Sequence, residues 1–328
     1  MPALEKNPIA SSLDAAEFSS KQGLTRRDIV SMYRVAEFVT LARDGSPVCW
    51  PLFPDFDQER LRFNTGYVYP TKARNAQREP RVAALFSDPS ASGRSDTDPL
   101  VLVQGIAEVF DQDLQRNTER YVDLLLRKGP PMFRLMLRVP LLRQLMVGYL
   151  ARIWIEVIPK QEYVWPRVGT LPDLLRRASR PSAFSPGTEI ALPENVFTWL
   201  PRYTRPPVLS YLDAAGWPAA IRVQATVRRD HIAIETEFEP SEGAPACLTY
   251  HRLIGNYRAN DAFLIRGHFD AAGRLIPERV VGYGGTQDDR GVGSLKLMRM
   301  LWDFRGQLVA QLEREGRPLP VVRPSAER

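Results

Sequence analysis

One pattern occurs twice in this sequence, and the repetition limits the folds that the chain can adopt. Residues 41–47 place an Asp-Gly pair between two apolar segments, and residues 212–218 place an Ala-Gly pair at the matching position, 171 residues later. The alternating segment at 61–65 returns at 232–236 with the same spacing. Glycine supplies the positive φ angles that hairpin turns need. We therefore expect two related units built from β-hairpins, with a chance match of two hairpin patterns as the alternative.

The order of strand and turn patterns in the first unit predicts an antiparallel sheet. A turn at 43–46 is followed by a second predicted turn at 55–59, and residues 61–65 alternate apolar and polar side chains, as a half-buried strand does. Strands are predicted at residues 36–42, 47–53, 61–65, 81–86, 100–110 and 153–157, the last ending at Pro159. Short strands joined by tight turns favour a closed barrel over a parallel sheet.

Helical patterns flank these strands. Thr25 resembles an N-cap with an acid three residues later, which predicts a short helix to about Arg34. Residues 111–150 are predicted to be helical. The chain ends in an amphipathic helix that Gly316 would stop. The apolar face of this helix consists of Leu297, Leu301, Phe304, Leu308 and Leu312.

These elements predict a mainly β protein with accessory helices, in which two β-barrels in tandem form a pseudo-dimer within one chain. Residues 24–166 would form the first barrel with its helical insert. Residues 167–194, dense in Pro, Arg and Ser, would form a linker. Residues 195–316 would form a second, degenerate barrel with the C-terminal helix.

The segment 132–150 is apolar and about long enough to span a bilayer, but it contains Arg134, Arg138, Arg143 and Pro140. Each arginine would cost several kcal/mol at the bilayer centre. An amphipathic helix with a kink is the better interpretation. It would cap its own barrel, with contact to a membrane surface as the less favoured alternative.

Composition restricts the function classes. The net charge is +6 and the pI about 9.4, and no dense basic block interleaved with aromatics points to nucleic acid. Cys49 and Cys247 are not at metal-ligand spacing, and the three histidines are scattered, so no metal site is predicted. Two lone thiols and the absence of an apolar signal core at the N-terminus lead us to expect a cytoplasmic protein.

The two units differ most between residues 65 and 85. There the second copy is about nine residues shorter. The first copy ends a strand at Thr65 and Gly66 and then has Thr71 as a candidate N-cap, followed by Lys72. A helix N-terminus beside a lysine suits a phosphate group, and Arg74 and Asn75 could supplement it. The second copy has carboxylates instead, at Glu235, Glu237, Glu239 and Glu242.

The order of these motifs resembles the pyridoxamine 5'-phosphate oxidase-like split-barrel superfamily, whose members bind FMN or the deazaflavin F420. The matching segments are Pro47-Val48 and residues 61–66, 71–75, 79–85, 103–108 and 152–159. The resemblance covers residues 24–165, and more faintly residues 206–283. The loop Tyr67-Val68-Tyr69-Pro70 and the polar insert 90–98 depart from the pattern.

The resemblance implies a role for each matching position. Thr71 and Lys72 would hold the cofactor phosphate, and Asn64 and Thr65 would lie along the ribityl chain or the phosphate. Gln104 would face the flavin ring, and the backbone of residues 48–51 would lie along the edge of that ring. The predicted cofactor-binding residues are Val48, Cys49, Trp50, Pro51, Asn64, Thr65, Gly66, Thr71, Lys72, Asn75 and Gln104. Trp50 would stack or gate, or be an ordinary barrel aromatic.

In this superfamily the cofactor lies between two barrels of a homodimer, and a tandem repeat would supply both barrels in one chain. We expect one cofactor per chain, with its phosphate on the first copy, and further homo-oligomerisation stays open. The expected function is an FMN-dependent oxidoreductase that transfers hydride to or from a small organic substrate; no catalytic side chain need exist, because the ring supplies this chemistry, and the catalytic residues stay unknown. The alternatives are an F420-dependent reductase and a non-catalytic protein that binds flavin, or haem through His251 or His268.

Overall fold

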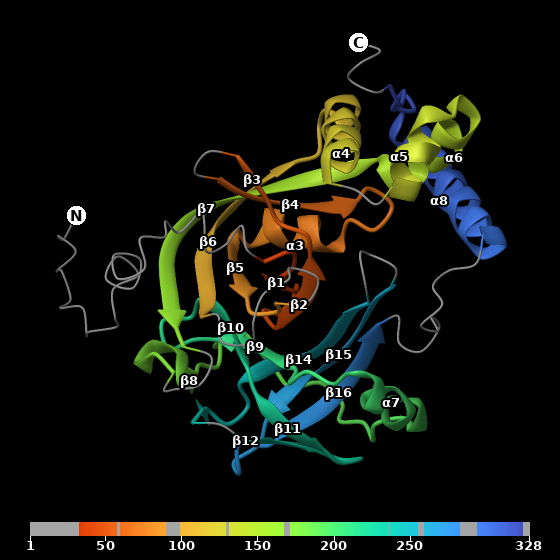
Figure 1. Ribbon diagram of the computed structural model, residues 1–328. Helices are drawn as coiled ribbons and strands as arrows, with labels where there is room; N and C mark the ends of the chain where they lie inside the picture. The colour runs from red at the N-terminus through yellow and green to blue at the C-terminus, as the bar shows by residue number, and fades with distance from the viewer. Residues whose placement is uncertain are drawn as a thin grey trace, which may run out of the picture.

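The structure is a computed structural model that describes residues 33–57, 60–89, 99–128, 131–166, 171–235, 237–254, 259–282 and 294–323. The polar insert 90–98 and nearly all of the helix predicted to begin at Thr25 lie outside these residues. The chain forms two curled antiparallel sheets, with helices gathered mainly around the first sheet (Figure 1).

The first sheet contains seven strands in the order β2-β1-β5-β6-β7-β4-β3. Its strands are β1 (Ala36–Leu41), β2 (Pro47–Leu52), β3 (Asp55–Asp57), β4 (Arg60–Gly66), β5 (Arg81–Phe86), β6 (Leu100–Phe110) and β7 (Arg152–Trp165). The predicted turn between β1 and β2 is confirmed, with Gly45 at φ 79°.

The second sheet has the equivalent order, β10-β9-β14-β15-β16-β12-β11. Its strands are β9 (Val208–Leu212), β10 (Pro218–Arg222), β11 (Gln224–Val227), β12 (Ile232–Glu235), β14 (Pro245–Ile254), β15 (Ala259–Phe269) and β16 (Leu275–Gly282). The mainly β fold with two curled half-barrel sheets and accessory helices, predicted from the sequence, is confirmed.

A β-bulge recurs at the same place in both sheets. The register between β6 and β7 shifts between Gln104 and Gly105, and that between β15 and β16 shifts between Arg266 and Gly267. Both glycines lie against the backbone of the next strand, so that an added Cβ would meet a carbonyl oxygen at 2.5 Å and 1.8 Å respectively. The two glycines therefore have the same structural role in the two sheets.

Two local predictions were wrong. Residues 55–57 form β3, which pairs with β4 through Asp55 and Arg62, where a turn was predicted. The last strand of the first unit does not end at Pro159 but continues to Trp165. Proline lacks a backbone N–H and usually ends ladder pairing. Here Pro159 lies opposite Gly105 at the bulge, where the ladder is already interrupted.

The helical insert is confirmed as three helices, α4 (Leu114–Lys128), α5 (Pro131–Arg138) and α6 (Pro140–Leu150). Pro140 separates α5 from α6. It is the first helical residue of α6, a position at which the N–H that proline lacks would have no partner within the helix. Within the described part of the chain, no helix combines the length and apolar character needed to cross a membrane.

The C-terminal helix α8 (Ser294–Glu315) follows the second sheet in sequence but packs on the first unit. Gly148 of α6 lies directly against the backbone of Phe304 and Arg305, and Figure 1 shows α8 beside α5 and α6. Leu301, Leu308 and Leu312 are buried in the core of the first barrel. Gly316 adopts φ 63° just after the helix, which confirms the predicted stop.

Strands β1 and β5 are buried on both faces because each takes part in two cores. Phe38 and Ala84 point into the first barrel, whereas Val39, Ala83 and Leu85 join the core that contains the second sheet. The two halves thus share a continuous apolar interface, and their separation would expose the outer face of two central strands.

The linker contributes to the second half. Its described part contains the 3₁₀ turn η1 (Asp173–Leu175) and strand β8 (Arg177–Ala178), and helix α7 (Glu194–Trp199) begins at its last residue. Strand β8 pairs in parallel with β13 (Glu239–Pro240), the segment that replaces the Thr71–Arg78 region of the first half. Leu175 and Ala178 are buried in the second core.

Candidate functional site

The segment after β4 forms a short loop and then helix α3 (Thr71–Arg78). The predicted N-cap was wrong by one residue, because Pro70 is the N-cap and Thr71 is the first helical residue. No side chain caps this end, and Thr71 is exposed. The first N–H groups of α3 therefore donate no hydrogen bond to an N-cap side chain.

Lys72 lies in the first turn of α3 and is half-buried. Its Nζ is 5.0 Å from the centre of the Trp50 ring, within cation–π range. The pKa of Lys72 is lowered from 10.5 to about 8, first by burial and second by the positive charge of Arg152. The structure thus brings together Lys72 and Trp50, two predicted cofactor-binding residues. It adds Arg152, which the sequence indicated only as part of a segment resembling the family's closing strand.

Arg152 is the first residue of β7 and pairs with Gly66 at the end of β4. Its guanidinium carbon lies 4.3 Å and 4.5 Å from the ring centres of Tyr121 and Tyr149, and its Nη2 donates to the Tyr121 hydroxyl at 3.1 Å. Its buried Nε has no hydrogen-bond partner among the described residues. A Cβ at Gly66 would lie 3.4 Å from Nη1. The missing side chain at Gly66 therefore leaves room beside the guanidinium.

The charge balance at this place is positive. In the described ranges, neither Lys72 nor Arg152 pairs with a carboxylate. Burial and the positive charge of Arg152 disfavour the charged form of Lys72, and an anion bound between the two side chains would favour it. Together with the unshared N–H groups at the start of α3, they form an arrangement suited to a phosphate group.

The loop between β4 and α3 is held by the C-terminal helix. The Tyr67 hydroxyl donates to Glu315 and accepts from Arg317 at 2.7 Å. The Tyr69 ring meets Phe304 edge-on, with 5.6 Å between ring centres. The bulky side chains of this loop, which depart from the family pattern, thus have a structural role. Its two tyrosines contact α8 and Arg317, which follows α8.

The remaining predicted residues of β4 and α3 divide between two surfaces. Asn64 and Gly66 are half-exposed on one face of β4, and Thr65 is buried on the other, where its hydroxyl donates to the Tyr69 carbonyl at 3.1 Å. Asn75 is buried, donates to the Thr40 hydroxyl at 3.2 Å and accepts from Arg78. Its amide therefore fixes α3 to β1, and a cofactor role for it stays a prediction.

Strand β2 presents its predicted residues alternately. Val48 and Trp50 are half-exposed, whereas Cys49 and Pro51 are buried. The Cys49 carbonyl accepts from the Thr249 hydroxyl at 3.3 Å, so this part of the strand faces the second sheet. Burial raises the pKa of the Cys49 thiol well above its ordinary value. Of these four residues, Trp50 is the one placed at Lys72.

Gln104 is fully buried at the bulge of β6. Its Nε2 donates to Asp213 at 2.8 Å and to the Pro218 carbonyl at 2.9 Å, both in the β9–β10 hairpin of the second half. Burial raises the pKa of the Asp213 carboxyl. These contacts show Gln104 connecting the two halves, and its predicted position facing a flavin ring stays a prediction.

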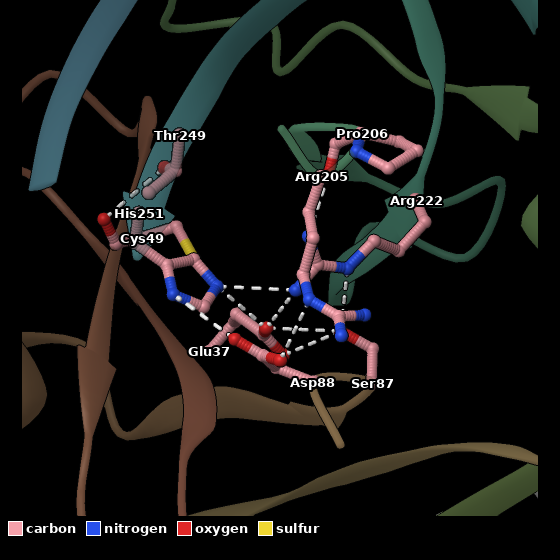
Figure 2. A network of polar contacts seen from close by, with 9 residues as sticks. All are labelled: Glu37, Cys49, Ser87, Asp88, Arg205, Pro206, Arg222, Thr249 and His251. Carbon is pink, nitrogen blue, oxygen red and sulfur yellow. Dashed lines mark hydrogen bonds and ion pairs between the residues drawn. The ribbon is translucent and has the colours of Figure 1, made fainter. Parts of the chain in front are cut away.

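A charged network that the sequence did not suggest lies at the interface between the halves (Figure 2). Glu37 of β1 accepts from Arg222 of β10 at 2.6 Å and contacts His251 Nε2 of β14 at 2.8 Å. Ser87 donates to Glu37 at 2.9 Å and accepts from Arg222 at 2.8 Å. Since Glu37 and His251 have fully buried side chains, the network ties the two sheets together.

The histidines considered as haem ligands both contact carboxylates. His251 meets Glu37 as described, and His268 Nδ1 lies 2.7 Å from Glu278. Over the described part of the chain, no group of three or more His, Cys, Asp or Glu residues could hold a metal ion.

Comparisons with known proteins add similarities of fold. No protein-family model and no curated protein matches the chain. A conserved hypothetical protein of Mycobacterium tuberculosis is similar in structure at 21% identity and a TM-score of 0.33, over 44% of this chain and 86% of that one. An F420 reductase is similar at 19% identity and a TM-score of 0.29, over 42% and 94%. An FAD-binding protein from Mesorhizobium loti is similar at 16% identity and a TM-score of 0.30, over 46% and 92%.

Each of these chains is matched nearly completely, while less than half of the present chain is covered. The present chain contains two sheets of the same strand order.

Proposed function

We propose that the protein binds one phosphate-bearing flavin or deazaflavin per chain, with FMN as the first choice and F420 as the alternative, and that it acts as an oxidoreductase. The observation that carries this proposal is the pair of cations at the start of α3. The Lys72 pKa is lowered first by burial and second by the positive charge of Arg152, and no described carboxylate pairs with either side chain. The proposal places the cofactor phosphate between them.

The residues present fit such a group. Lys72 supplies a point charge. Arg152 supplies a planar guanidinium whose buried Nε can donate a hydrogen bond to the phosphate. Gly66 allows close approach of a ligand to the backbone. Trp50, already in contact with the Lys72 amine, provides an aromatic face beside the phosphate position. Hydride transfer is chemistry that the bound ring supplies, and the chain's own residues would bind and orient it.

One cofactor per chain is supported by the second half. The segment equivalent to α3 is the short strand β13, which is paired with β8 of the linker. Its surroundings are acidic, because Glu235, Glu237, Glu239 and Glu242 belong to this region. Carboxylates there would repel a phosphate. We therefore expect the second half to cover part of the bound cofactor without holding a phosphate of its own.

Titration of the purified protein with FMN, followed by flavin fluorescence, tests the proposal. The matched pair of variants is Lys72→Ala and Lys160→Ala, since Lys160 is an exposed lysine on β7 with no described ion pair. Loss of a charged hydrogen bond should weaken FMN binding by about 1–3 kcal/mol in Lys72→Ala. Lys160→Ala should bind as the parent does. A parallel titration with F420 distinguishes the two cofactors.

The stoichiometry and the variants can each contradict the proposal. Two equivalent tight sites per chain would rule out the one-sided arrangement. Equal affinities in Lys72→Ala and the parent protein would remove the phosphate from Lys72. If neither FMN nor F420 bound the parent protein, the proposed cofactor binding would be contradicted.

A further inference from the structure

The joint between α5 and α6 exposes apolar side chains to an unusual degree. Leu141 is 79% exposed, Leu135 63% and Val139 40%, although all three lie within seven residues of the chain. Scattered single apolar residues on a surface need no explanation, but a local cluster of this size marks an interaction site. We call residues 134–141 the elbow.

Along the chain, the charged residues on either side of the elbow have one sign. No Asp or Glu occurs between Asp123 and Glu156, a stretch that contains five arginines and one lysine. Arg134 and Arg138 are exposed in the elbow, one helical turn apart, and the exposed Arg127 precedes it at the end of α4. Apolar side chains flanked by arginines fit a surface that is apolar inside and anionic at its boundary, which is the chemistry of an anionic phospholipid bilayer.

The position of the elbow allows such contact. The buried side of α6 contacts α8 through Gly148, and Met136 and Leu137 of α5 belong to the core. Pro140 redirects the chain between these two helices, so that the joint lies outside the packed helices. In Figure 1, α5 and α6 lie at the edge of the molecule, on the side away from the second sheet.

We propose that the elbow is a membrane-surface docking site. Leu135, Val139 and Leu141 enter the headgroup region of an anionic leaflet while Arg134 and Arg138 contact lipid phosphates. The docking is peripheral. It is independent of the proposed cofactor site, because none of the five side chains contacts Lys72 or Arg152.

Flotation of the full-length protein with lipid vesicles tests the proposal. Vesicles of phosphatidylcholine alone are compared with vesicles of phosphatidylcholine and phosphatidylglycerol in equal parts. We expect binding to the anionic vesicles only, and weakening as salt is raised, because the attraction is screened. Arg134→Gln together with Arg138→Gln should weaken vesicle binding about 25-fold, at about fivefold for each arginine.

The apolar contribution is tested by Leu135→Gln together with Leu141→Gln, which should weaken binding at least about tenfold. The matched control is Leu174→Gln, which removes an exposed leucine from η1 in the linker and should leave vesicle binding unchanged. Thermal unfolding of each variant checks that it is folded. Binding that is absent, or equal on neutral vesicles, would overturn the proposal. A concentration-dependent dimer that Leu141→Gln dissociates would assign the elbow to a second copy of the chain instead.

Discussion

Lys72 Nζ lies 5.0 Å from the centre of the Trp50 ring, and the same amine experiences the positive charge of Arg152. The aromatic face favours the charged amine, whereas burial and the neighbouring guanidinium oppose it. The opposing effects are the larger ones, since the Lys72 pKa is lowered to about 8. Because its pKa is lowered, the charged form of the Lys72 amine is stabilised more by an anionic ligand than the charged form of an exposed lysine is.

The first prediction concerns the pH dependence of phosphate binding. In the free protein the Lys72 pKa is about 8, and a bound phosphate should return it toward 10.5. FMN affinity should therefore fall as pH rises above about 8, by up to about tenfold per pH unit, and binding at that pH should take up a proton. Isothermal titration calorimetry in buffers of different ionisation enthalpy measures the proton uptake.

Lys72→Gln is the control for this titration, because it removes the titrating amine and should remove the proton uptake. The phosphate itself is fully ionised well above its own pKa of about 6, so it does not contribute in this range. Proton uptake that persists in Lys72→Gln would assign the effect to another group.

The second prediction concerns the two bulge glycines. Gly105→Ala and Gly267→Ala should each destabilise the protein, by about 1–3 kcal/mol, because the new methyl group overlaps a carbonyl oxygen of the adjacent strand. Gly267→Ala should be the more severe, since the oxygen of Ile276 would lie 1.8 Å from the Cβ. Urea unfolding followed by circular dichroism measures both.

Gly306→Ala is the matched control in this series. Gly306 lies in α8 with no atom within 4 Å of an added Cβ, so alanine should stabilise the protein by about 0.5–1 kcal/mol through helix propensity. Destabilisation of the same size in all three variants would contradict the steric explanation.

The third prediction concerns the ion pair between the halves. Arg222→Met should destabilise the protein by about 3–5 kcal/mol, because it leaves the buried Glu37 carboxylate without its closest cation. Replacing both residues with methionine should recover most of that loss. The exposed pair Arg229–Glu194 is the control, and Arg229→Met should change the free energy of unfolding by less than about 1 kcal/mol. Equal effects at the two sites would show that burial does not decide the energetics.

The fourth prediction concerns the loop before α3. Tyr67→Phe removes a hydroxyl that bonds to both Glu315 and Arg317, so it should destabilise the attachment of α8 by about 1.5–3 kcal/mol. Tyr69→Phe keeps the ring contact with Phe304 and should be nearly neutral. Hydrogen exchange of the α8 amides measures the attachment, and unchanged protection in Tyr67→Phe would contradict this role.

Much of the fold could be predicted because its signals are local. Glycine at 45 and 216 specifies the two hairpins, and the alternating segment at 61–65 specifies a half-buried strand. The repeat of residues 41–47 and 61–65 at 212–218 and 232–236 indicated two equivalent halves, and the structure adds a bulge shared by Gly105 and Gly267. In contrast, Pro159 was misinterpreted as a strand end, since the bulge that tolerates it depends on a partner strand about fifty residues away.

The candidate site could be predicted only in part. Lys72 is visible in sequence because it stands at a helix start, but Arg152 is the first residue of a strand 80 residues later, and only the β4–β7 pairing brings the two close. The network around Glu37 leaves no sequence pattern, since its members come from four separate elements of both halves. Gln104 was predicted to face a bound flavin ring. Its contact with Asp213 belongs to the interface between the halves, which the spacing of residues in the sequence does not reveal.

The placement of α8 has a consequence for synthesis on the ribosome. The core of the first barrel needs Leu301, Leu308 and Leu312, which are translated after the whole second sheet. When the first half emerges, part of its apolar surface therefore has no partner yet, so complete folding of the N-terminal half is delayed until α8 has been synthesised. Ribosome-bound chains that stop before residue 294 should remain more sensitive to proteases than chains that include α8.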